Sequence, residues 1–395
     1  MLPHLMSDLR HLLAIKFLII SAASLLAPIL SEKLKWFFIP SIVFELMLGV
    51  LIGPHMLGWV EPLPQINALA MPGLALLIFL VGFEIDTQHM QGRMLLLATV
   101  SWLIALSLAY MLAKCMVDVG LVSEVAIVAI ALSTTALGVL LPILQDTKHA
   151  SSKFKALVLV VGSMSQFVPI LVISILFTTS TLVTSSLSLV VFILLSIASG
   201  WFFIKMSRIN LFRFLRKHYY LSSQLPVRVS VFLIFLLAAL AVQLKLNVLL
   251  GTFAAGMVVR RVTAPRDRML IDGKLKALGY SFIIPLFFIV SGMHIDIPAL
   301  AVPGTISRML FFCVCLIIVR ILPVFVLFRR ELNVRECRAL VCFSATTLPL
   351  IIVITHLGMM TGKLMSANAV ALVGAGVLSV VIFPVLGLKQ LQARV

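Results

Sequence analysis

The sequence predicts an all-α integral membrane protein of about thirteen transmembrane helices, arranged as inverted repeats with paired broken helices. Three observations lead to this fold class: the composition, the succession of apolar runs, and two matching clusters of hydroxyl residues. Of the 395 residues, 62% are apolar and 11% are charged, whereas soluble domains have about 45–50% apolar and about 25% charged residues. A soluble fold of this length lacks the interior to hide these side chains, so we expect lipid to solvate them.

The apolar runs give the number of helices. A membrane-spanning helix needs roughly 20 mostly apolar residues, and the chain contains thirteen runs that approach or exceed this requirement. The shortest, Val248–Val259, contains two glycines and is the weakest. The predicted spans are Leu12–Leu30, Trp36–Gly53, Ala68–Phe83, Met94–Met116, Leu121–Ile143, Phe154–Phe177, Leu182–Phe203, Val229–Val242, Val248–Val259, Leu278–Met293, Thr305–Phe328, Ala339–Leu357 and Met365–Leu388.

The basic residues predict the orientation. Lysine and arginine are enriched in cytoplasmic loops, and most of the 31 such residues fall in alternate connections, among them Lys205–Arg228, Arg260–Lys276 and Arg329–Arg338. This alternation places the N-terminus outside and the C-terminus in the cytoplasm. The net charge of +17 therefore reflects membrane topology, and we expect no nucleic-acid partner.

Two hydroxyl clusters predict the inverted repeat. They lie within the fifth and twelfth spans, which run in opposite directions across the membrane. Paired broken helices of this kind meet at the substrate site of many transporters, and Gly138 and Pro349 favour the breaks. The alternative is that the hydroxyls bond back within continuous helices or join neighbouring helices. The candidate pathway residues in the clusters are Ser133, Thr134, Thr135, Ser344, Thr346 and Thr347.

Ionisable and strongly polar groups at membrane depth are candidates for function, because their burial in lipid is costly. Arg320 lies well inside Thr305–Phe328, and Glu45 lies within Trp36–Gly53. Arg320 has either a role coupled to the substrate or a structural role as a clamp on helix-end carbonyls. Glu45 is a possible proton carrier or a structural residue. Ser165 and Gln166 occupy the centre of a polar segment in the sixth span, as pathway residues or as a contact between helices.

The sequence contains no nucleotide-binding loop, no cluster of metal ligands and no nucleophile elbow. We therefore expect no enzyme activity, no catalytic residue, no metal site and no cofactor. The connections between spans are short, so residues 1–395 are expected to form a single transmembrane domain without a soluble regulatory domain.

Five segments carry a family resemblance. Each is a weak signal by itself, but they occur in order along nearly the whole chain, which resembles the monovalent cation:proton antiporter superfamily in its bacterial Kef-type and NapA-type branch. The segments are Pro40–Pro54, Leu76–Asp86, Ser133–Ala136, Leu249–Gly256 and Pro285–Asp296.

The resemblance implies the NapA/NhaA-like antiporter fold, an all-α fold of inverted repeats with two crossing broken helices. It also implies a homodimer in the bacterial inner membrane, and exchange of Na⁺ or K⁺ for protons by alternating access. In the family, the core helix after the first crossing helix carries an ion-binding aspartate within a pair of polar residues. Here that pair falls on Ser165 and Gln166, and neither residue is acidic. The family's basic partner falls near Arg320.

This departure leaves three hypotheses open. The chain is a cation:proton antiporter that uses Glu45 or the Ser165 and Gln166 oxygens. Alternatively, it transports an anion or an organic solute past Arg320, or it is a transport-inactive paralogue on the same scaffold.

Overall fold

The computed structural model describes residues 2–34, 39–84, 92–137, 140, 144, 150–176, 182–208 and 224–392, and within them every regular element is helical. The helices are α1 (Leu2–Lys33), α2 (Ser41–Ile52), α3 (Pro64–Glu84), α4 (Gly92–Asp118), α5 (Val125–Ser133), α7 (Ser152–Leu176), α8 (Leu182–Arg208), α10 (Leu225–Gln243), α11 (Val248–Val262), α12 (Pro265–Leu278), the π-helical turn η2 (Gly279–Ile283), α13 (Ile284–Met293), α14 (Pro298–Ala301), α15 (Thr305–Phe328), α16 (Val334–Ala345), α17 (Pro349–Met360) and α18 (Ser366–Gln392).

Nine helical segments of the described chain are long and apolar enough to cross a membrane, and shorter apolar helices occur at Ser41–Ile52 and Leu187–Phe202. The predicted class, an α-helical integral membrane protein, is therefore confirmed. The count of thirteen spans stays a prediction. Of the long connection Lys205–Arg228, most residues lie outside the described part.

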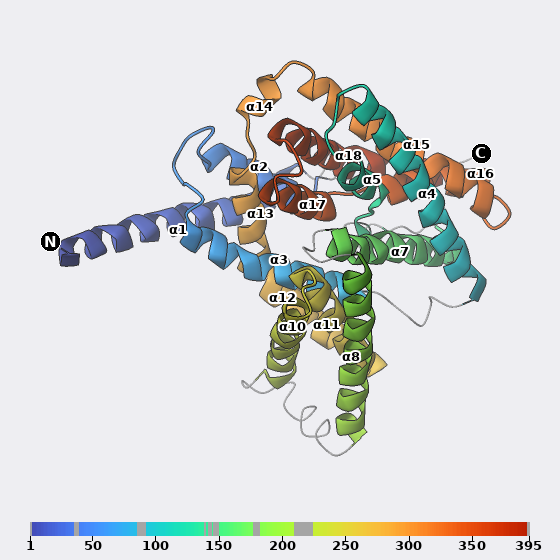
Figure 1. The fold of residues 1–395 in the computed structure, drawn as a ribbon, viewed down its shortest axis with the longest axis horizontal. Helices are drawn as coiled ribbons and strands as arrows, with labels where there is room; N and C mark the ends of the chain where they lie inside the picture. Colours follow the sequence, from blue (N-terminus) through green and yellow to red (C-terminus); the bar gives the residue numbers. More distant parts are fainter. Residues whose placement is uncertain are drawn as a thin grey trace. The chain divides into compact units, whose positions relative to one another are not determined.

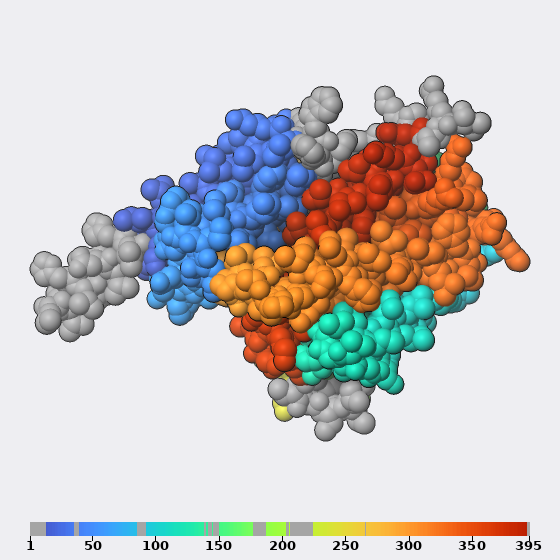
Figure 2. All heavy atoms as spheres, turned by 90° about the horizontal axis from the view of Figure 1, so that it is seen from above, coloured from blue at the N-terminus to red at the C-terminus, as the bar shows by residue number. Residues whose placement is uncertain are grey.

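The chain divides into two compact units. The first comprises Met1–Pro72, Gly92–Ser165 and Phe282–Val395, and the second comprises Gly73–Gln91 and Gln166–Ser281. Within the first unit, α4 packs along α15, as the teal and orange segments of Figure 2 show. Within the second unit, α11 packs against both α10 and α8.

One basic connection is helical over most of its length. The segment Arg260–Lys276 covers the end of α11 and most of α12, and the helical segment Arg266–Met293, which includes the predicted span Leu278–Met293, is long and apolar enough to cross a membrane. Its cytoplasmic position stays a prediction. A proline in the first turn starts α12, where its missing N–H costs nothing. Ile271 and Leu275, one turn apart, are buried, so this basic helix has an apolar face that hydropathy averaged over the segment conceals.

Glycines bring α2 and α13 into backbone contact within the first unit. A Cβ added to Gly49 would lie less than 3.0 Å from the carbonyl oxygen of Ile289, and one added to Gly292 would lie as close to that of Leu46. No side chain fits such a gap, so both glycines are required for this approach of the two helices.

The same arrangement occurs between α3 and α11 in the second unit. A Cβ on Gly82 would clash with the carbonyl oxygen of Phe253, and a Cβ on Gly256 would clash with that of Phe79. In both helix pairs, each glycine faces the carbonyl of the residue three positions before the partner's glycine. The two helix pairs therefore share one register. Taken with the order of the helices along the chain, it matches α2 with α11 and α3 with α13, as expected for two copies of one repeat.

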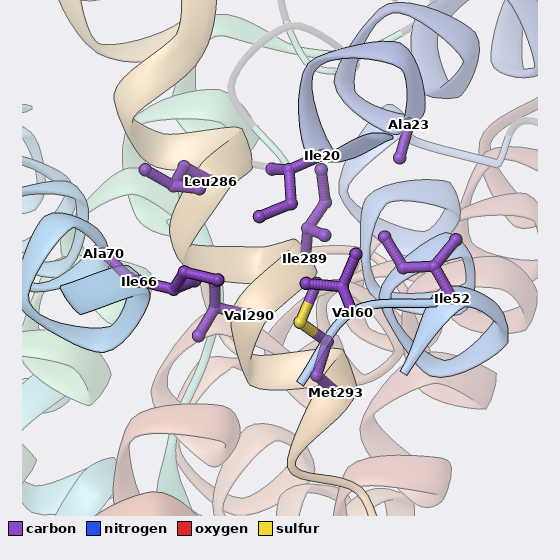
Figure 3. Packing of buried hydrophobic residues seen from close by; sticks show 10 residues of the cluster. All are labelled: Ile20, Ala23, Ile52, Val60, Ile66, Ala70, Leu286, Ile289, Val290 and Met293. Atoms are coloured by element: carbon purple, nitrogen blue, oxygen red, sulfur yellow. The ribbon is translucent and has the colours of Figure 1, made fainter. Parts of the chain in front are cut away.

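An apolar cluster surrounds α13 in the first unit. Ile289 and Met293 of α13 pack with Ile20 of α1, Ile52 of α2 and Ile66 at the start of α3, as Figure 3 shows. All five side chains are less than 5% exposed. Burial of apolar area stabilises by about 25 cal/mol per Å² where the reference state is water, so this cluster fixes α13 among three other elements.

The glycine contacts predict that glycine-to-alanine substitutions at the helix contacts lower the stability, whereas the same change at an uncrowded glycine does not. Gly49→Ala and Gly256→Ala should each lower the thermal unfolding temperature of the purified protein, because overpacking costs about 1–3 kcal/mol. Gly273→Ala is the matched control, because its Cβ would meet no atom within 4 Å; alanine there should preserve or raise stability. Equal unfolding temperatures for all three variants would contradict the close packing.

Candidate functional site

Two helices break in the middle of the first unit. α5 ends at Ser133, and Thr134 continues in an extended conformation with φ −81° and ψ 158°. α16 ends at Ala345, and Thr346 is likewise extended, with φ −71° and ψ 118°, before α17 starts at Pro349. The breaks fall inside the two hydroxyl clusters, as the sequence predicted; Gly138 lies outside the described residues.

The two extended segments are bonded to each other. The backbone N–H of Ala136 donates to the carbonyl of Thr346 at 2.8 Å. The hydroxyls of Thr134 and Thr347 lie 2.7 Å apart, which is hydrogen-bonding distance. The Thr135 hydroxyl donates to the Ser344 carbonyl at 2.6 Å. These bonds satisfy backbone groups that the breaks would otherwise leave without partners. α5 and α17 accordingly lie close together in Figure 1.

A serine on each following helix supports the crossing. The N–H of Thr135 donates to the carbonyl of Ser165 on α7 at 3.3 Å. The N–H of Thr347 donates to the hydroxyl of Ser379 on α18 at 3.0 Å, and that hydroxyl donates to the Thr347 carbonyl at 2.7 Å. Ser379 was missed by the sequence analysis. The available signal was its position along the chain, because Ser379 follows Thr347 at nearly the same interval as Ser165 follows Thr135.

Arg320 of α15 binds the carboxyl end of α5. One terminal guanidinium nitrogen donates to the carbonyls of Ser133 and Thr134, the latter at 3.0 Å, and to the Thr135 hydroxyl at 3.3 Å. The other donates to the Ser165 hydroxyl at 3.3 Å. Arg320 is 2% exposed, and only its Nε lacks a partner among the described atoms.

The electrostatic compensation of Arg320 comes from a helix end. The last carbonyls of a helix have no donors within it and carry about half a negative charge, so a cation there is stabilised. Among the residues that the structure describes, no carboxylate forms an ion pair with Arg320. This contact pattern is that of a clamp. It disfavours an anion site, since a bound anion would have to displace four existing hydrogen bonds.

Several predicted hydroxyls bond within their own helices. Four hydroxyls donate to a carbonyl three or four residues earlier: Ser133 to Ile130, Thr134 to Ala131, Ser344 to Val341 and Thr346 to Cys342. For these four, the back-bonding alternative describes the side chain, although the helices are broken. Three of these residues still take part in the crossing with their backbone, because the carbonyls of Ser133, Ser344 and Thr346 accept hydrogen bonds there.

Gln166 and Glu45 are both buried, Gln166 in the second unit and Glu45 in the first. The side-chain oxygen of Gln166 lacks a hydrogen-bond partner among the described residues, as does Oε2 of Glu45. Glu45 is 5% exposed and is the one acidic residue of the described chain that is buried as a whole. It lies on α2 one turn before Gly49, and the repeat register equates it with Thr252, a neutral residue.

The comparisons with known proteins identify the family. The family model for the transmembrane sodium/hydrogen exchanger matches residues 21–388. The chain therefore belongs to the sodium/hydrogen exchanger family, a family of membrane transporters.

The relatives have low sequence identity to this chain, but the similarity covers most of its length. A protein of Bacillus subtilis (strain 168), named "Putative Na(+)/H(+) antiporter YjbQ", is 24% identical over 98% of this chain. The chain spans 64% of that relative's length. The Na(+)/H(+) antiporter of Enterococcus hirae is 24% identical over 72% of this chain and 73% of its own length. The sodium proton antiporter MjNhaP1 from Methanocaldococcus jannaschii has a similar fold, with TM-score 0.66 and 17% identity over 98% of this chain and 100% of that one.

The clamp predicts that Arg320 is a stability determinant. Arg320→Gln should lower the thermal unfolding temperature, because buried carbonyls left without donors cost about 1–3 kcal/mol. Arg320→Lys should recover part of the loss, since an ammonium supplies charge but not the planar fork. Arg330→Gln, on an exposed residue, is the control and should have no effect. A fully stable Arg320→Gln variant would contradict the clamp.

Proposed function

We propose that this chain is a secondary-active antiporter that exchanges a monovalent cation, Na⁺ or K⁺, for protons by alternating access. The observation that carries the proposal is the pair of crossing broken helices in a chain whose family match runs from residue 21 to residue 388. It is supported by the Na⁺/H⁺ antiporter names of the relatives from Bacillus subtilis and Enterococcus hirae.

The proposed cation site lies at the crossing. Its ligands are oxygens of the hydroxyls of Thr134 and Thr347 and of backbone carbonyls, which suit Na⁺ and K⁺ because hard cations prefer oxygen. Freed carbonyls at the ends of half-helices bind Na⁺ in other transporters of inverted-repeat architecture. Ser165 of α7, one of the two positions where the family carries its acid, adds a hydroxyl oxygen.

In this proposal, the guanidinium of Arg320 competes with the transported cation for the same carbonyl oxygens. Its guanidinium holds the Ser133 and Thr134 carbonyls, which are ligands that a mobile cation would also use. Cation entry would therefore release Arg320 from these carbonyls, and cation exit would restore the clamp. Arginine cannot give up its proton, so a different group must carry the transported proton.

Glu45 is the proposed proton carrier. It is buried, and its Oε2 has no partner among the described residues, so a proton there competes with no hydrogen bond at that oxygen. We further propose a homodimer in the bacterial inner membrane with the N-terminus outside and the C-terminus cytoplasmic. The exposed Leu18 and Leu25 of α1 suit contact with the lipid bilayer or with a second copy.

The proposal predicts cation-dependent proton flux. In everted membrane vesicles that contain the protein, Na⁺ or K⁺ should dissipate an imposed pH gradient, followed with a fluorescent amine. Glu45→Gln should reduce the flux at least about tenfold, because the amide cannot exchange a proton. Glu124→Gln, a change at the start of α5 where the side chain makes no capping bond, is the matched control.

The outcomes separate the parts of the proposal. If neither Na⁺, K⁺ nor Li⁺ dissipates the gradient between pH 6 and 9, antiport itself is wrong. If the flux persists in folded Glu45→Gln protein, antiport stands and the role of Glu45 is wrong.

A further inference from the structure

A small cavity in the first unit is lined by nitrogen and sulfur ligands that the crossing does not use. Its volume is about 240 Å³, and it lies between the start of α3, the end of α13 and the end of α17. Each helix contributes a pair of residues three or four positions apart, so each pair lies on one helix face. The pairs are Asn67 and Met71, Ser291 and His294, and His356 and Met360; Met359 also lines the cavity.

His294 is held in the tautomer that a metal ligand requires. Its Nδ1 lies 2.8 Å from the Val290 carbonyl oxygen. A carbonyl only accepts, so Nδ1 carries the proton, and the neutral ring has a free lone pair on Nε2. Histidines that bind metals use this arrangement regularly, with the second ring nitrogen bonded to a backbone carbonyl or a carboxylate.

His356 supplies the second nitrogen. Its Nε2 is buried and has no hydrogen-bond partner among the described residues, which is a costly state for a polar atom. The ring centres of His294 and His356 lie 5.8 Å apart. Two imidazoles that bind one ion through nitrogen at about 2.0 Å would have ring centres about 5–6 Å apart, so the observed separation fits a shared ion.

The remaining donors indicate the type of metal. Met71, Met359 and Met360 bring thioethers to the same cavity, and the described residues include no group of three or more His, Cys, Asp or Glu that could hold a metal. Thioether sulfur is a soft ligand that selects Cu(I), whereas carboxylates and waters suit Mg²⁺, Ca²⁺ and Mn²⁺. The buried Oδ1 of Asn67 also lacks a hydrogen-bond partner among the described atoms, and it could serve as an uncharged oxygen ligand.

We propose that this cavity is a binding site for a soft monovalent metal ion, Cu(I) or its chemical analogue Ag(I), with His294 and His356 as nitrogen ligands and methionine thioethers completing the coordination. The beginning of α3 and the ends of α13 and α17 all fall on the outer side in the predicted topology, so the site would meet metal from outside the cell. The proposal does not depend on which cation the crossing transports.

The test uses purified full-length protein in detergent, with the five cysteines replaced by alanine because thiols also bind these ions. Ag(I) is titrated by calorimetry, since it needs no reductant. The protein should bind one equivalent that His294→Gln and His356→Gln each remove or weaken at least about tenfold, the scale of effects at metal sites. Met359→Leu combined with Met360→Leu should also weaken binding. His55→Gln, on an exposed histidine, should not.

X-ray absorption gives a second readout that does not depend on the folding of histidine or methionine variants. It is measured on Cu(I) bound to the same cysteine-free protein, with its histidines and methionines intact. We expect both nitrogen and sulfur neighbours around the metal. The site is refuted if both histidine variants retain the full Ag(I) affinity, or if the absorption data show no sulfur. The soft-metal assignment is also contradicted if the histidine variants lose Ag(I) binding while the methionine double variant binds Ag(I) as tightly as the parent protein.

Discussion

A helix that stops inside a membrane leaves carbonyl groups without donors, and this constraint governs the centre of the protein. α5 stops at Ser133, and the guanidinium of Arg320 supplies donors to the carbonyls of Ser133 and Thr134. The positive charge is in turn stabilised by the negative end of the helix. A buried arginine and a broken helix are each costly alone, and each removes the cost of the other.

The backbone groups at the end of the second broken helix find different partners. At the end of α16, the carbonyls of Ser344 and Thr346 accept bonds from Thr135 and Ala136 of the opposite segment. In the part of the chain that the structure describes, the end of α5 is therefore the one of the two helix ends that binds a charged side chain. In the proposed mechanism, the end of α5 is the place where a transported cation and Arg320 compete.

The glycine contacts explain how two copies of a repeat pack with so little shared sequence. Gly49 with Gly292, and Gly82 with Gly256, set the same register through backbone contact in separate helix pairs. Backbone contact needs only that a side chain be absent, so the other residues of the repeat are free to differ. This freedom allows Glu45 in one repeat to correspond to Thr252 in the other.

Hydropathy and the hydroxyl clusters were enough to predict the helical membrane fold and the sites of both breaks. The sequence left Arg320 open between a role coupled to the substrate and a clamp on helix-end carbonyls. The individual partners of Arg320 could not be predicted, because two of the four are backbone carbonyls, which every residue has. The helical state of Pro265–Leu278 was missed because its charges mask an apolar face of Ile271 and Leu275. The pairing of His294 with His356 depends on two helices distant in sequence, and no local pattern reports it.

The central claim is that Arg320 occupies oxygens that the transported cation also uses. Its most direct test is the dissociation constant of Na⁺ for purified protein, measured by calorimetry for the native sequence and for Arg320→Gln. Competition predicts tighter Na⁺ binding in the variant, because the carbonyls of Ser133 and Thr134 become free and a like charge is removed. Unchanged or weaker binding in folded variant protein would contradict the claim.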